Sequence, residues 1–505
     1  MKFRYFKILS LAIAGIVLAT SCKKFLDINK DPDRIPANNP PLAQLLTSAQ
    51  MNLSFEGGSD LYRYSALIAQ QMSGQASQPN QTYEYDRYNI TGSDLNNVWG
   101  SIFAATLSDL ELIIKNATDG GSPHYAGVAK ILKAYEYSLV VDTWGKVPYS
   151  EAQQLDAMTS PHYDDDATIY PKLITLLNEG ITDVNQATSN LSPGSNSLMY
   201  GSNFTTAKAN WVKLANTIKL RLYLHYSKKD PTFSKAQMDA LINSGATFMA
   251  SSADNFQMIF NNAANQRNPI TQFEVSRPDY LFANATMVNL MNAKSDPRRP
   301  FYFTPFPFTS SPATYKGVTA GDPKSINYSR IHTYLRGTAT GTPVQQLGGG
   351  ILSDAYTYSG TAPLRMVTYP EYCFMRAEAG LMGVANSDPQ TWFTNGINAS
   401  MQQAGVSAAN ITTYLAANGT LAGTNAQKLQ QIIEEKYVAI FGQSVEPWTD
   451  FRRTGYPVLI PPANRVAQVT NVPRSLFYAQ QEIDLNPNCP GQKSPDLQTR
   501  VFWDN

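Results

Sequence analysis

The chain has 505 residues, of which 43% are hydrophobic and only 16% are charged, so it can bury a large core and is not expected to be disordered. Its 40 basic residues nearly balance 39 acidic ones, and a net charge of +1 supplies no general attraction toward nucleic acid or anionic lipid. Three cysteines are too few for a disulfide framework.

The N-terminal residues have the pattern of an export signal. Residues 1–7 carry three basic side chains and no acid, and residues 8–19 are almost entirely apolar. Twelve residues are too few for a lasting membrane span, which needs roughly 20. Small residues then lead into Cys22, an order that resembles a bacterial lipobox. We therefore expect a signal peptide at 1–21, a lipid such as palmitate on Cys22, and a polar tether over 22–41; a plain secretory signal with a chance cysteine is the alternative.

Helical periodicity recurs along the rest of the chain. Apolar residues repeat at i, i+3, i+4 and i+7 in four segments, which are 95–113, 128–139, 211–222 and 429–441. Ser93-Asp94 and Thr424-Asn425 are expected to cap the first and the last of them. Further helices are expected at 42–55, 61–72, 167–187, 234–243, 278–293, 370–382 and 388–404. Paired helices of this length predict a mainly α fold of stacked helical hairpins, although no strict 34-residue repeat is visible.

The amino-acid composition changes between residues 246 and 365, where Pro, Gly, Thr, Ser and aromatic residues dominate. A triple glycine at 348–350 is expected to interrupt regular secondary structure there. Long loops of this kind are usually functional or disordered, and the density of aromatic residues argues against disorder. A second such loop covers 73–92. We expect one body over 42–505, which divides into a helical scaffold (42–245 and 366–460), a loop-rich excursion (246–365) and a C-terminal segment (461–505).

The sequence contains no recognisable catalytic or metal-binding motif. None of its four histidines lies three or four residues from another, and neither a G-x-S-x-G elbow nor a Walker A loop occurs. The acidic run Asp164-Asp165-Asp166 precedes an expected helix, so capping of that helix is the favoured interpretation over a metal cluster. Paired carboxylates for glycoside hydrolysis remain open. Cys373 is expected to be a buried inert thiol, and its pairing with Cys489 stays open. We predict no catalytic residue, metal or cofactor.

A series of short motifs follows in order along the chain. After the opening Cys-Lys-Lys-Phe-Leu-Asp at 22–27, the motifs are D-T-W-G-K-V-P-Y at 142–149, W-V-K-L-A-N-T-I-K-L-R-L at 211–222, D-P-R at 296–298, Y-P-E through A-E-A at 369–379, E-P-W-T-D-F-R-R-T-G-Y-P at 446–457, V-P-R at 472–474 with Glu482 and Asn486 beyond it, and F-W-D at 502–504. Together they cover nearly the whole chain after residue 22. In this order they resemble the motifs of the SusD/RagB family of nutrient-binding outer-membrane lipoproteins.

The resemblance implies a mainly helical fold with tetratricopeptide-like hairpins and a loop-rich portion that carries the ligand site. It implies a lipoprotein on the outer face of the outer membrane. Such a protein captures an oligosaccharide or a peptide and delivers it to a TonB-dependent, SusC-like β-barrel transporter, and members of the family are not enzymes. Two alternatives are a surface glycoside hydrolase and a structural scaffold of an envelope complex.

Most motif residues are interpreted as structural. Gly145 and Pro148 are expected to end a helix, and Arg221 to pair with an acid such as Glu378. Ion pairing of the arginines near residue 452 with nearby acids, rather than ligand binding, is expected to order their loop. The full set of structural residues is Trp144, Gly145, Pro148, Trp211, Arg221, Trp448, Asp450, Arg452 and Arg453.

Ligand-binding residues are expected in the loops, because sugar rings stack on aromatic faces while amides and arginines bond their hydroxyl groups. The first candidates are Tyr83, Tyr85, Arg87 and Tyr88, and the second group is Tyr302, Tyr315, Tyr328 and Tyr334. The alternative for each ring is that it fastens a loop to the body, with its hydroxyl bonded to the backbone.

Overall fold

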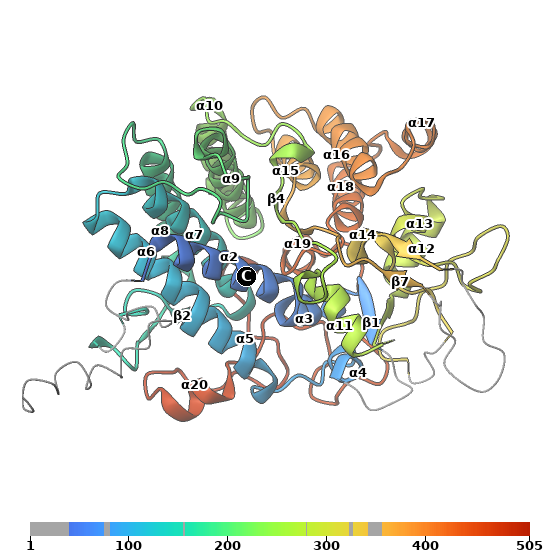
Figure 1. Cartoon of the computed structure of the whole chain (residues 1–505). Coiled ribbons are helices and arrows are strands. Elements are labelled where there is room, and N and C mark those ends of the chain that lie inside the picture. Colours follow the sequence, from blue (N-terminus) through green and yellow to red (C-terminus); the bar gives the residue numbers. More distant parts are fainter. Residues whose placement is uncertain (1–39, 75–80, 155–156, 279, 323–326, 342–355) are drawn as a thin grey trace, which may run out of the picture.

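A computed structural model describes residues 40–505 except 75–80, 155–156, 279, 323–326 and 342–355. Cys22, the expected signal peptide and the glycines at 348–350 lie outside these residues. The described chain is mainly α-helical, as predicted (Figure 1). Among its helices, none has both the length and the hydropathy that crossing a bilayer would take.

From α6 to α10 the helices form a row, each packed against the next one in sequence. The contacts run from α6 to α7, from α7 to α8, from α8 to α9 and from α9 to α10. α7 and α8 approach closely at two glycines: a Cβ on Gly127 would lie 2.8 Å from the carbonyl oxygen of Gly180. The helices are α2 (Leu42–Gly58), α3 (Asp60–Ile68), α4 (Gln81–Asp86), α5 (Asn96–Gly100), α6 (Leu107–Asp119), α7 (Pro123–Trp144), α8 (Asp166–Val184), α9 (Phe204–His225) and α10 (Pro231–Asn243), with a 3-10 turn η2 (Ser93–Leu95) and a π-helical stretch η3 (Ser101–Thr106) before α6.

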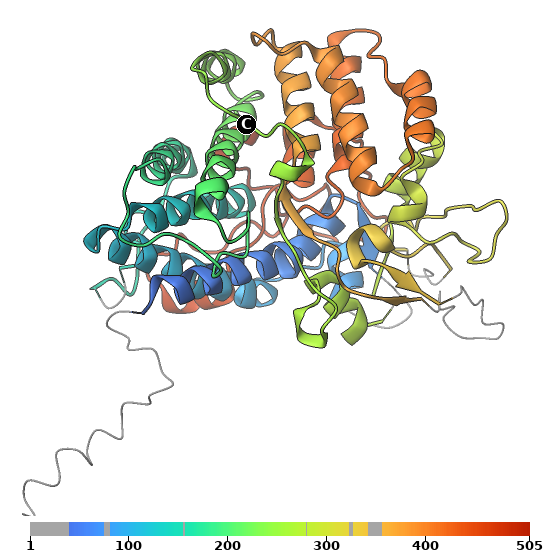
Figure 2. The ribbon, with the colours of Figure 1, turned by 45° about the horizontal axis from the view of Figure 1, so that its top comes forward.

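A second group of helices follows residue 368 and stands beside α9 (Figure 2). Its first helix starts with a capping box, in which Thr368 and Glu371 bond each other's backbone N–H groups, and Thr424 with Gln427 starts α18 in the same way, as expected for Thr424. The helices are α15 (Tyr369–Leu381), α16 (Pro389–Ala404), α17 (Ala408–Asn418), α18 (Asn425–Ala439), α19 (Glu446–Thr454) and α20 (Gln480–Leu485), with a 3-10 turn η7 (Phe502–Asp504) at the end.

Residues 246–365 contain short helices and strands between long connections. Every sheet in the described chain is an antiparallel pair, with orders β1–β5, β2–β3, β4–β8 and β6–β7. The strands are β1 (Met72–Gly74), β2 (Val147–Pro148), β3 (Tyr163–Asp164), β4 (Phe256–Met258), β5 (Leu281–Ala283), β6 (Ala339–Thr340), β7 (Thr357–Tyr358) and β8 (Leu364–Val367). The helices of this part are α11 (Pro269–Ser276), α12 (Ala285–Ala293), α13 (Arg299–Tyr302) and α14 (Thr333–Arg336), with 3-10 turns η5 (Ser252–Asp254) and η6 (Ala264–Gln266).

Three local predictions are wrong. The helix expected at 278–293 begins only at Ala285, because Asn284 caps it and the preceding residues form β5. The helix expected at 61–72 ends at Ile68, and Met72, the last residue of the predicted range, starts β1. Ser93 and Asp94 do not cap a helix: they lie in η2, where Asp94 accepts the N–H of Thr91.

The acidic run before α8 also differs from its expected capping role. Asp165 occupies the N-cap position without a side-chain bond to the helix. Asp164 instead accepts the N–H groups of Tyr149 and Ser150, and Asp166 accepts those of Ala167 and Phe502. These carboxylates therefore fasten neighbouring segments to the start of α8.

Two of the motif tryptophans, Trp144 and Trp448, are buried and bonded to backbone. The Trp144 indole donates to the carbonyl of Phe477 (2.8 Å), and the Trp448 indole donates to that of Pro473 (2.8 Å). Arg452 lies flat on Trp448, with Cζ 3.9 Å from the ring centroid. Gly145 ends α7 with a φ of 75°, a conformation that L side chains disfavour. These contacts join α7 and α19 to the C-terminal segment.

A cluster of buried charges joins four helices. Arg221 of α9 bonds Glu371 of α15 (2.5 Å), and Lys436 of α18 bonds both Glu446 (2.8 Å) and Asp450 (2.8 Å) of α19. All five side chains are at most 5% exposed. Burial alone would raise the pKa of Glu446, but Lys436 and Arg221 hold it well below its usual range.

Glu378 has a different partner from the expected one. Arg453 rather than Arg221 pairs with it, with Nη2 2.8 Å from Oε2, and the same guanidinium also bonds Asp450 (2.8 Å). Glu371 lies two helical turns nearer the start of α15 than Glu378 does, and it is the residue that Arg221 of α9 reaches. The cluster thus continues from α18 through α19 to the middle of α15.

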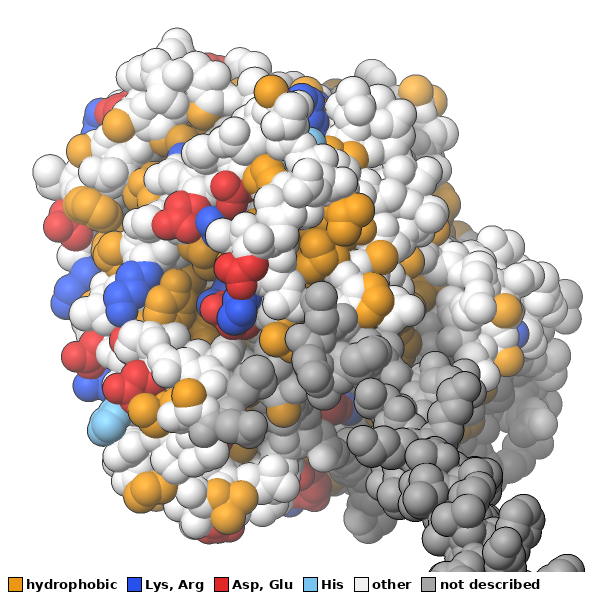
Figure 3. Space-filling view, turned by 60° about the vertical axis from the view of Figure 1, so that its left-hand side comes forward, with side chains coloured by type: hydrophobic (Ala, Val, Ile, Leu, Met, Phe, Trp, Pro, Cys, Tyr) orange, Lys and Arg blue, Asp and Glu red, His pale blue; other side chains and the backbone are white. Residues whose placement is uncertain are grey.

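Away from this cluster, the surface has no dominant charge on the face over α6 and α8. Figure 3 shows acidic and basic side chains there interspersed with apolar ones. Exposed pairs such as Lys115–Asp119, an i,i+4 pair on α6, are of the kind that contributes little to stability.

Arg221→Met should destabilise the protein, because it leaves Glu371 buried without its cation. The expected loss is about 3–5 kcal/mol of unfolding free energy, measured by chemical denaturation. Lys115→Met removes one partner of an exposed pair and should cost less than about 1 kcal/mol. Equal losses for the two variants would contradict a structural role for the buried cluster.

Candidate ligand-binding site

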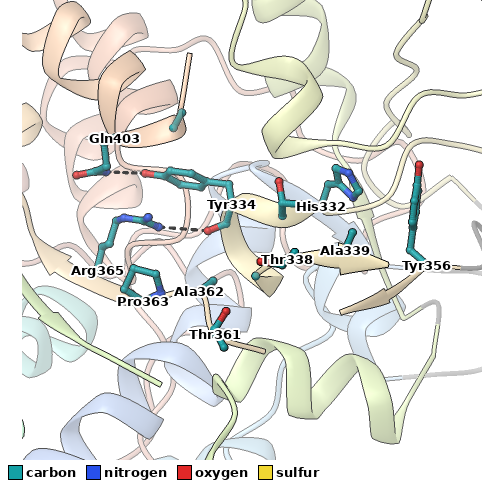
Figure 4. A pocket seen from close by; sticks show the side chains of 13 residues that line it. His332, Tyr334, Thr338, Ala339, Tyr356, Thr361, Ala362, Pro363, Arg365 and Gln403 are labelled. Carbon is teal, nitrogen blue, oxygen red and sulfur yellow. Dashed lines mark hydrogen bonds between the residues drawn. The ribbon is translucent and has the colours of Figure 1, made fainter. Parts of the chain in front are cut away.

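An open cavity of about 590 Å³ lies where β6, α14, β8 and the end of α16 meet (Figure 4). Its wall combines aromatic rings, hydroxyl groups, one amide and one guanidinium. The lining residues are His332, Thr333, Tyr334, Gly337, Thr338, Ala339, Tyr356, Thr361, Ala362, Pro363, Arg365, Gln403 and Ala404.

Tyr334 lies with Gln403 and Arg365 at one end of this wall and is held on three sides. Its hydroxyl accepts a hydrogen bond from Gln403 Nε2 (2.7 Å). Arg365 Cζ lies 4.1 Å from its ring centroid, and Arg365 Nη1 donates to its carbonyl (3.2 Å). Behind it, the buried ring of Tyr302 lies 4.4 Å away between centroids. The ring is therefore fixed before any ligand arrives.

Gln403 is oriented by a further amide. Asn255 Nδ2 donates to Gln403 Oε1 (2.7 Å), while Asn255 Oδ1 accepts the N–H of Tyr369 at the start of α15 (2.8 Å). The Gln403 oxygen and nitrogen thus each have a protein partner, and the side chain presents a fixed edge to the cavity. The amide links the end of α16 to β4 and α15.

A second aromatic group, His332 with Tyr356, lies at the other end of the cavity. The two ring centroids are 5.0 Å apart, and His332 Nδ1 shares a hydrogen bond with the hydroxyl of Tyr358 (2.8 Å). Burial, together with the nearby charge of Arg336, lowers the pKa of His332 to about 4. His332 is therefore neutral at pH 7 and acts as a hydrogen-bonding ring.

Gly337 sets the turn between these two groups. It ends α14 with a φ of 85°, and its N–H donates to the carbonyl of Thr333 (2.8 Å). A Cβ here would lie 2.5 Å from Ser359 Oγ and 2.7 Å from the nitrogen of Thr361. Glycine is required both by the backbone conformation and by the close approach of the neighbouring strand.

The cavity wall consists of groups that form hydrogen bonds and stacking contacts. Among its described lining residues there is no aspartate, glutamate, lysine or cysteine, so the pair of carboxylates that a glycosidase needs is missing from this wall. Within the part of the chain that the structure describes, no group of three or more His, Cys, Asp or Glu is placed to hold a metal ion. Rings, hydroxyls and an amide are groups that recognise a polar ligand without reacting with it.

The first set of sequence candidates lies away from the cavity. Tyr85 and Tyr88 are buried, each only 1% exposed, and Tyr85 packs on Tyr64 at 4.7 Å between centroids. Tyr83 and Arg87 are half-buried and bond to Asn464: Asn464 Nδ2 donates to the Tyr83 hydroxyl (2.8 Å), and Arg87 Nε donates to the Asn464 carbonyl (3.0 Å). These contacts fasten the loop to the C-terminal segment, and a ligand role for its residues remains a prediction.

The second set is divided between core and cavity. Tyr334 lines the cavity, and Tyr302 lies buried behind it with its hydroxyl donating to the carbonyl of Val438 (3.1 Å). Tyr315 and Tyr328 are half-buried elsewhere; Arg299 Cζ lies 5.4 Å from the Tyr315 ring, and the Tyr328 hydroxyl donates to Asp322 (3.2 Å). A ligand role for these two rings also remains a prediction.

Tyr334 is the one lining residue among the sequence candidates, and the largest lining side chains that sequence reasoning missed are His332, Tyr356, Arg365 and Gln403. They come from a loop before α14, a segment before β7, strand β8 and the end of α16, so no local spacing connects them. The one available signal is Arg365, a charged residue in a strand whose other residues are buried.

Cys373 behaves as expected of a buried thiol. Neither Cys373 nor Cys489 forms a disulfide in the structure. Burial raises the pKa of Cys373 to about 12, which leaves it protonated and unreactive at neutral pH.

Comparison with known proteins agrees with this architecture. The SusD-like family described as "Starch-binding associating with outer membrane" matches residues 34–479. A solved structure named as a chitin-binding protein has 24% sequence identity and a TM-score of 0.75, over 92% of this chain and 100% of that one. A chitin-binding SusD homologue from Flavobacterium johnsoniae has 23% identity and a TM-score of 0.71, over 92% and 96% of the two chains.

A third solved structure, a SusD-like protein from Bacteroides thetaiotaomicron VPI-5482, has 22% identity and a TM-score of 0.72, over 92% and 98% of the two chains. The comparison with curated proteins gave no match. At these identities the solved structures establish a shared fold.

Asp86→Asn should change how stability depends on pH. Burial raises the pKa of Asp86 from its usual 3.8 to about 8, although the N–H of Gly321 bonds its carboxyl (2.6 Å). The contribution of Asp86 to the free energy of unfolding is therefore fully present below about pH 4, and it is lost as pH rises toward 8 and the buried carboxyl must ionise. The melting temperature of the variant, relative to wild type, should rise between pH 4.5 and 8. A difference that is constant with pH would contradict the burial of an uncharged carboxyl, and exposed Asp119→Asn is the control.

Gly337→Ala should destabilise the cavity turn. The variant must adopt a φ of 85° and also displace Ser359 and Thr361, so a loss of about 2–4 kcal/mol in unfolding free energy is expected. Gly201→Ala is the matched control, because Gly201 has a φ of 81° with nothing within 4 Å of the added Cβ, and should lose only about 1–2 kcal/mol. If both variants lose the same amount, the close packing at this turn is not as described.

Proposed function

The chain belongs to the SusD-like family, and from this we propose that it is a carbohydrate-binding protein of the outer membrane that holds an oligosaccharide in the cavity around Tyr334. The observation that carries the proposal is the wall itself. Two aromatic groups stand at its ends, with hydroxyls, an amide and a guanidinium between them, and no carboxylate pair lies among its described residues.

The wall suits a sugar better than it suits most other ligands. Pyranose rings have apolar C–H faces that pack on aromatic rings, and hydroxyl groups around their edge that both donate and accept hydrogen bonds. Tyr356 and His332 supply rings, while Gln403 and Thr338 supply polar groups. A peptide could use the same groups, but the names of two structurally similar proteins, each given as chitin-binding, favour a carbohydrate.

The proposal extends to location and delivery. The basic, apolar and small-residue pattern before Cys22 supports a lipid anchor on that cysteine, and membership of a family described as associating with the outer membrane supports attachment there. We propose that the bound oligosaccharide is passed to a SusC-like β-barrel transporter. We therefore favour binding at this site over the alternative that the protein is a glycoside hydrolase.

Substitutions in the wall should weaken oligosaccharide binding. Protein lacking residues 1–22 is screened against a panel of oligosaccharides, and the best ligand is measured by calorimetry. Gln403→Ala and Tyr356→Ala should each weaken binding roughly tenfold, because each removes one hydrogen-bonding or stacking group. Melting temperatures establish that the variants are folded.

Tyr83→Ala is the matched control, since it removes a half-buried tyrosine of the other loop, and it should leave the affinity unchanged. Loss of binding in this variant, with normal binding in the two cavity variants, would move the site to the loop at 81–88. Release of new reducing ends by the purified protein would replace the binding proposal with hydrolysis.

A further inference from the structure

Among the described residues, Arg365 lacks the acidic partner that three buried arginines of this protein have. Arg221, Arg298 and Arg453 each have a carboxylate partner within 2.8 Å. Arg365 has no carboxylate partner in the described chain; it donates once, from Nη1 to the carbonyl of Tyr334. Its Nε is buried without a hydrogen-bond partner among the described residues. A guanidinium has five donors, and the bond to Tyr334 uses one of the four on the terminal nitrogens, so these nitrogens of Arg365 have donors left for a ligand.

The strand aims this side chain at the cavity. In β8, Leu364, Met366 and Val367 are buried, and Arg365 is the one residue that is partly exposed. Figure 4 shows its guanidinium beneath Tyr334, next to the open space. The arginine is therefore a wall residue rather than part of the hydrophobic core.

A second unpaired cation lies behind the aromatic end of the cavity. Arg336 Cζ is 3.7 Å from the ring centroid of Tyr358, whose hydroxyl bonds His332. Its Nε is also buried without a hydrogen-bond partner in the described structure, and no carboxylate in that structure forms an ion pair with it. The two arginines thus give this end of the molecule positive charge that no described acid neutralises.

The other titratable groups described near the wall do not neutralise the charges of Arg365 and Arg336. His332 is neutral at pH 7, since burial lowers its pKa to about 4. Asp254, beside the Asn255 that orients Gln403, is already paired with Lys213 (2.9 Å). None of the described lining residues is an acid. The described part of the cavity wall therefore carries positive charge across the pH range in which uronates and sulfates are negative.

We propose that the oligosaccharide bound here is acidic, and that its carboxylate or sulfate group bonds Arg365. This inference rests on the proposed function and narrows its ligand class. A hydrogen bond in which both partners are charged is roughly twice as strong as a neutral one, and a guanidinium can hold a carboxylate or sulfate through two parallel bonds. A neutral glycan would leave the donors of Arg365 incompletely used.

The test compares glycans that differ only in charge. Protein lacking residues 1–22 is titrated with oligogalacturonate and with its fully methyl-esterified form, and with a sulfated galactan oligosaccharide and its desulfated form. We expect the acidic member of at least one pair to bind tenfold or more tightly than the neutral member, with the preference reduced at high salt.

Variants assign the preference to Arg365. Arg365→Gln should bring the ratio of acidic to neutral affinity close to 1, and Arg365→Lys, which keeps the charge, should retain a ratio above 3. Arg277→Gln makes the same change in net charge at an exposed position outside the lining and should leave the ratio as in wild type.

The outcomes separate the two proposals. Neutral glycans that bind as well as acidic ones would overturn the acidic ligand and leave carbohydrate binding standing. A preference that survives in Arg365→Gln would overturn the role of this arginine. Absence of binding to every glycan of a broad panel would overturn the proposed function as well.

Discussion

The buried ion pairs between α9, α15, α18 and α19 are the constraint on which the rest of the molecule depends. Transfer of a charged group from water into a protein interior is costly, and the cost is offset only where partners meet at close range with good geometry. Arg221 with Glu371, and Lys436 with Glu446, satisfy that condition with N–O distances of 2.5 and 2.8 Å. Other arrangements of these helices would leave charges unpaired, so the cluster favours one relative placement.

The same cluster reaches the ligand cavity. Besides Glu371, Arg221 donates to the carbonyl of Met366, which follows Arg365 in β8 (3.4 Å). On the other side, Asn255 joins the start of α15 to Gln403. Two wall residues are thus positioned by the helical frame rather than by the loops. A site that is rigid in advance binds without the entropic cost of ordering its side chains.

The sequence predicted the frame better than the cavity, for a physical reason. Helices such as α9 and α18 are recognisable in the sequence because their buried face repeats every three or four residues. Several of the motifs that resemble the SusD/RagB family also lie on helices, namely on α9, α15 and α19. Ion pairs between residues far apart in the sequence have no such period, so the sequence does not identify Glu371, rather than Glu378, as the partner of Arg221. The cavity side chains come from four separate segments, and only Tyr334 was selected, because aromatic density alone does not distinguish a ring in a wall from one in the core.

Hydrogen exchange of backbone amides, with and without a saturating oligosaccharide, would locate the ligand on the structure. We expect slower exchange on binding over residues 332–340 and 357–366, where α14, β6, β7 and β8 surround the cavity, and no change over 81–88. Protection confined to 81–88, with the cavity segments unchanged, would contradict it.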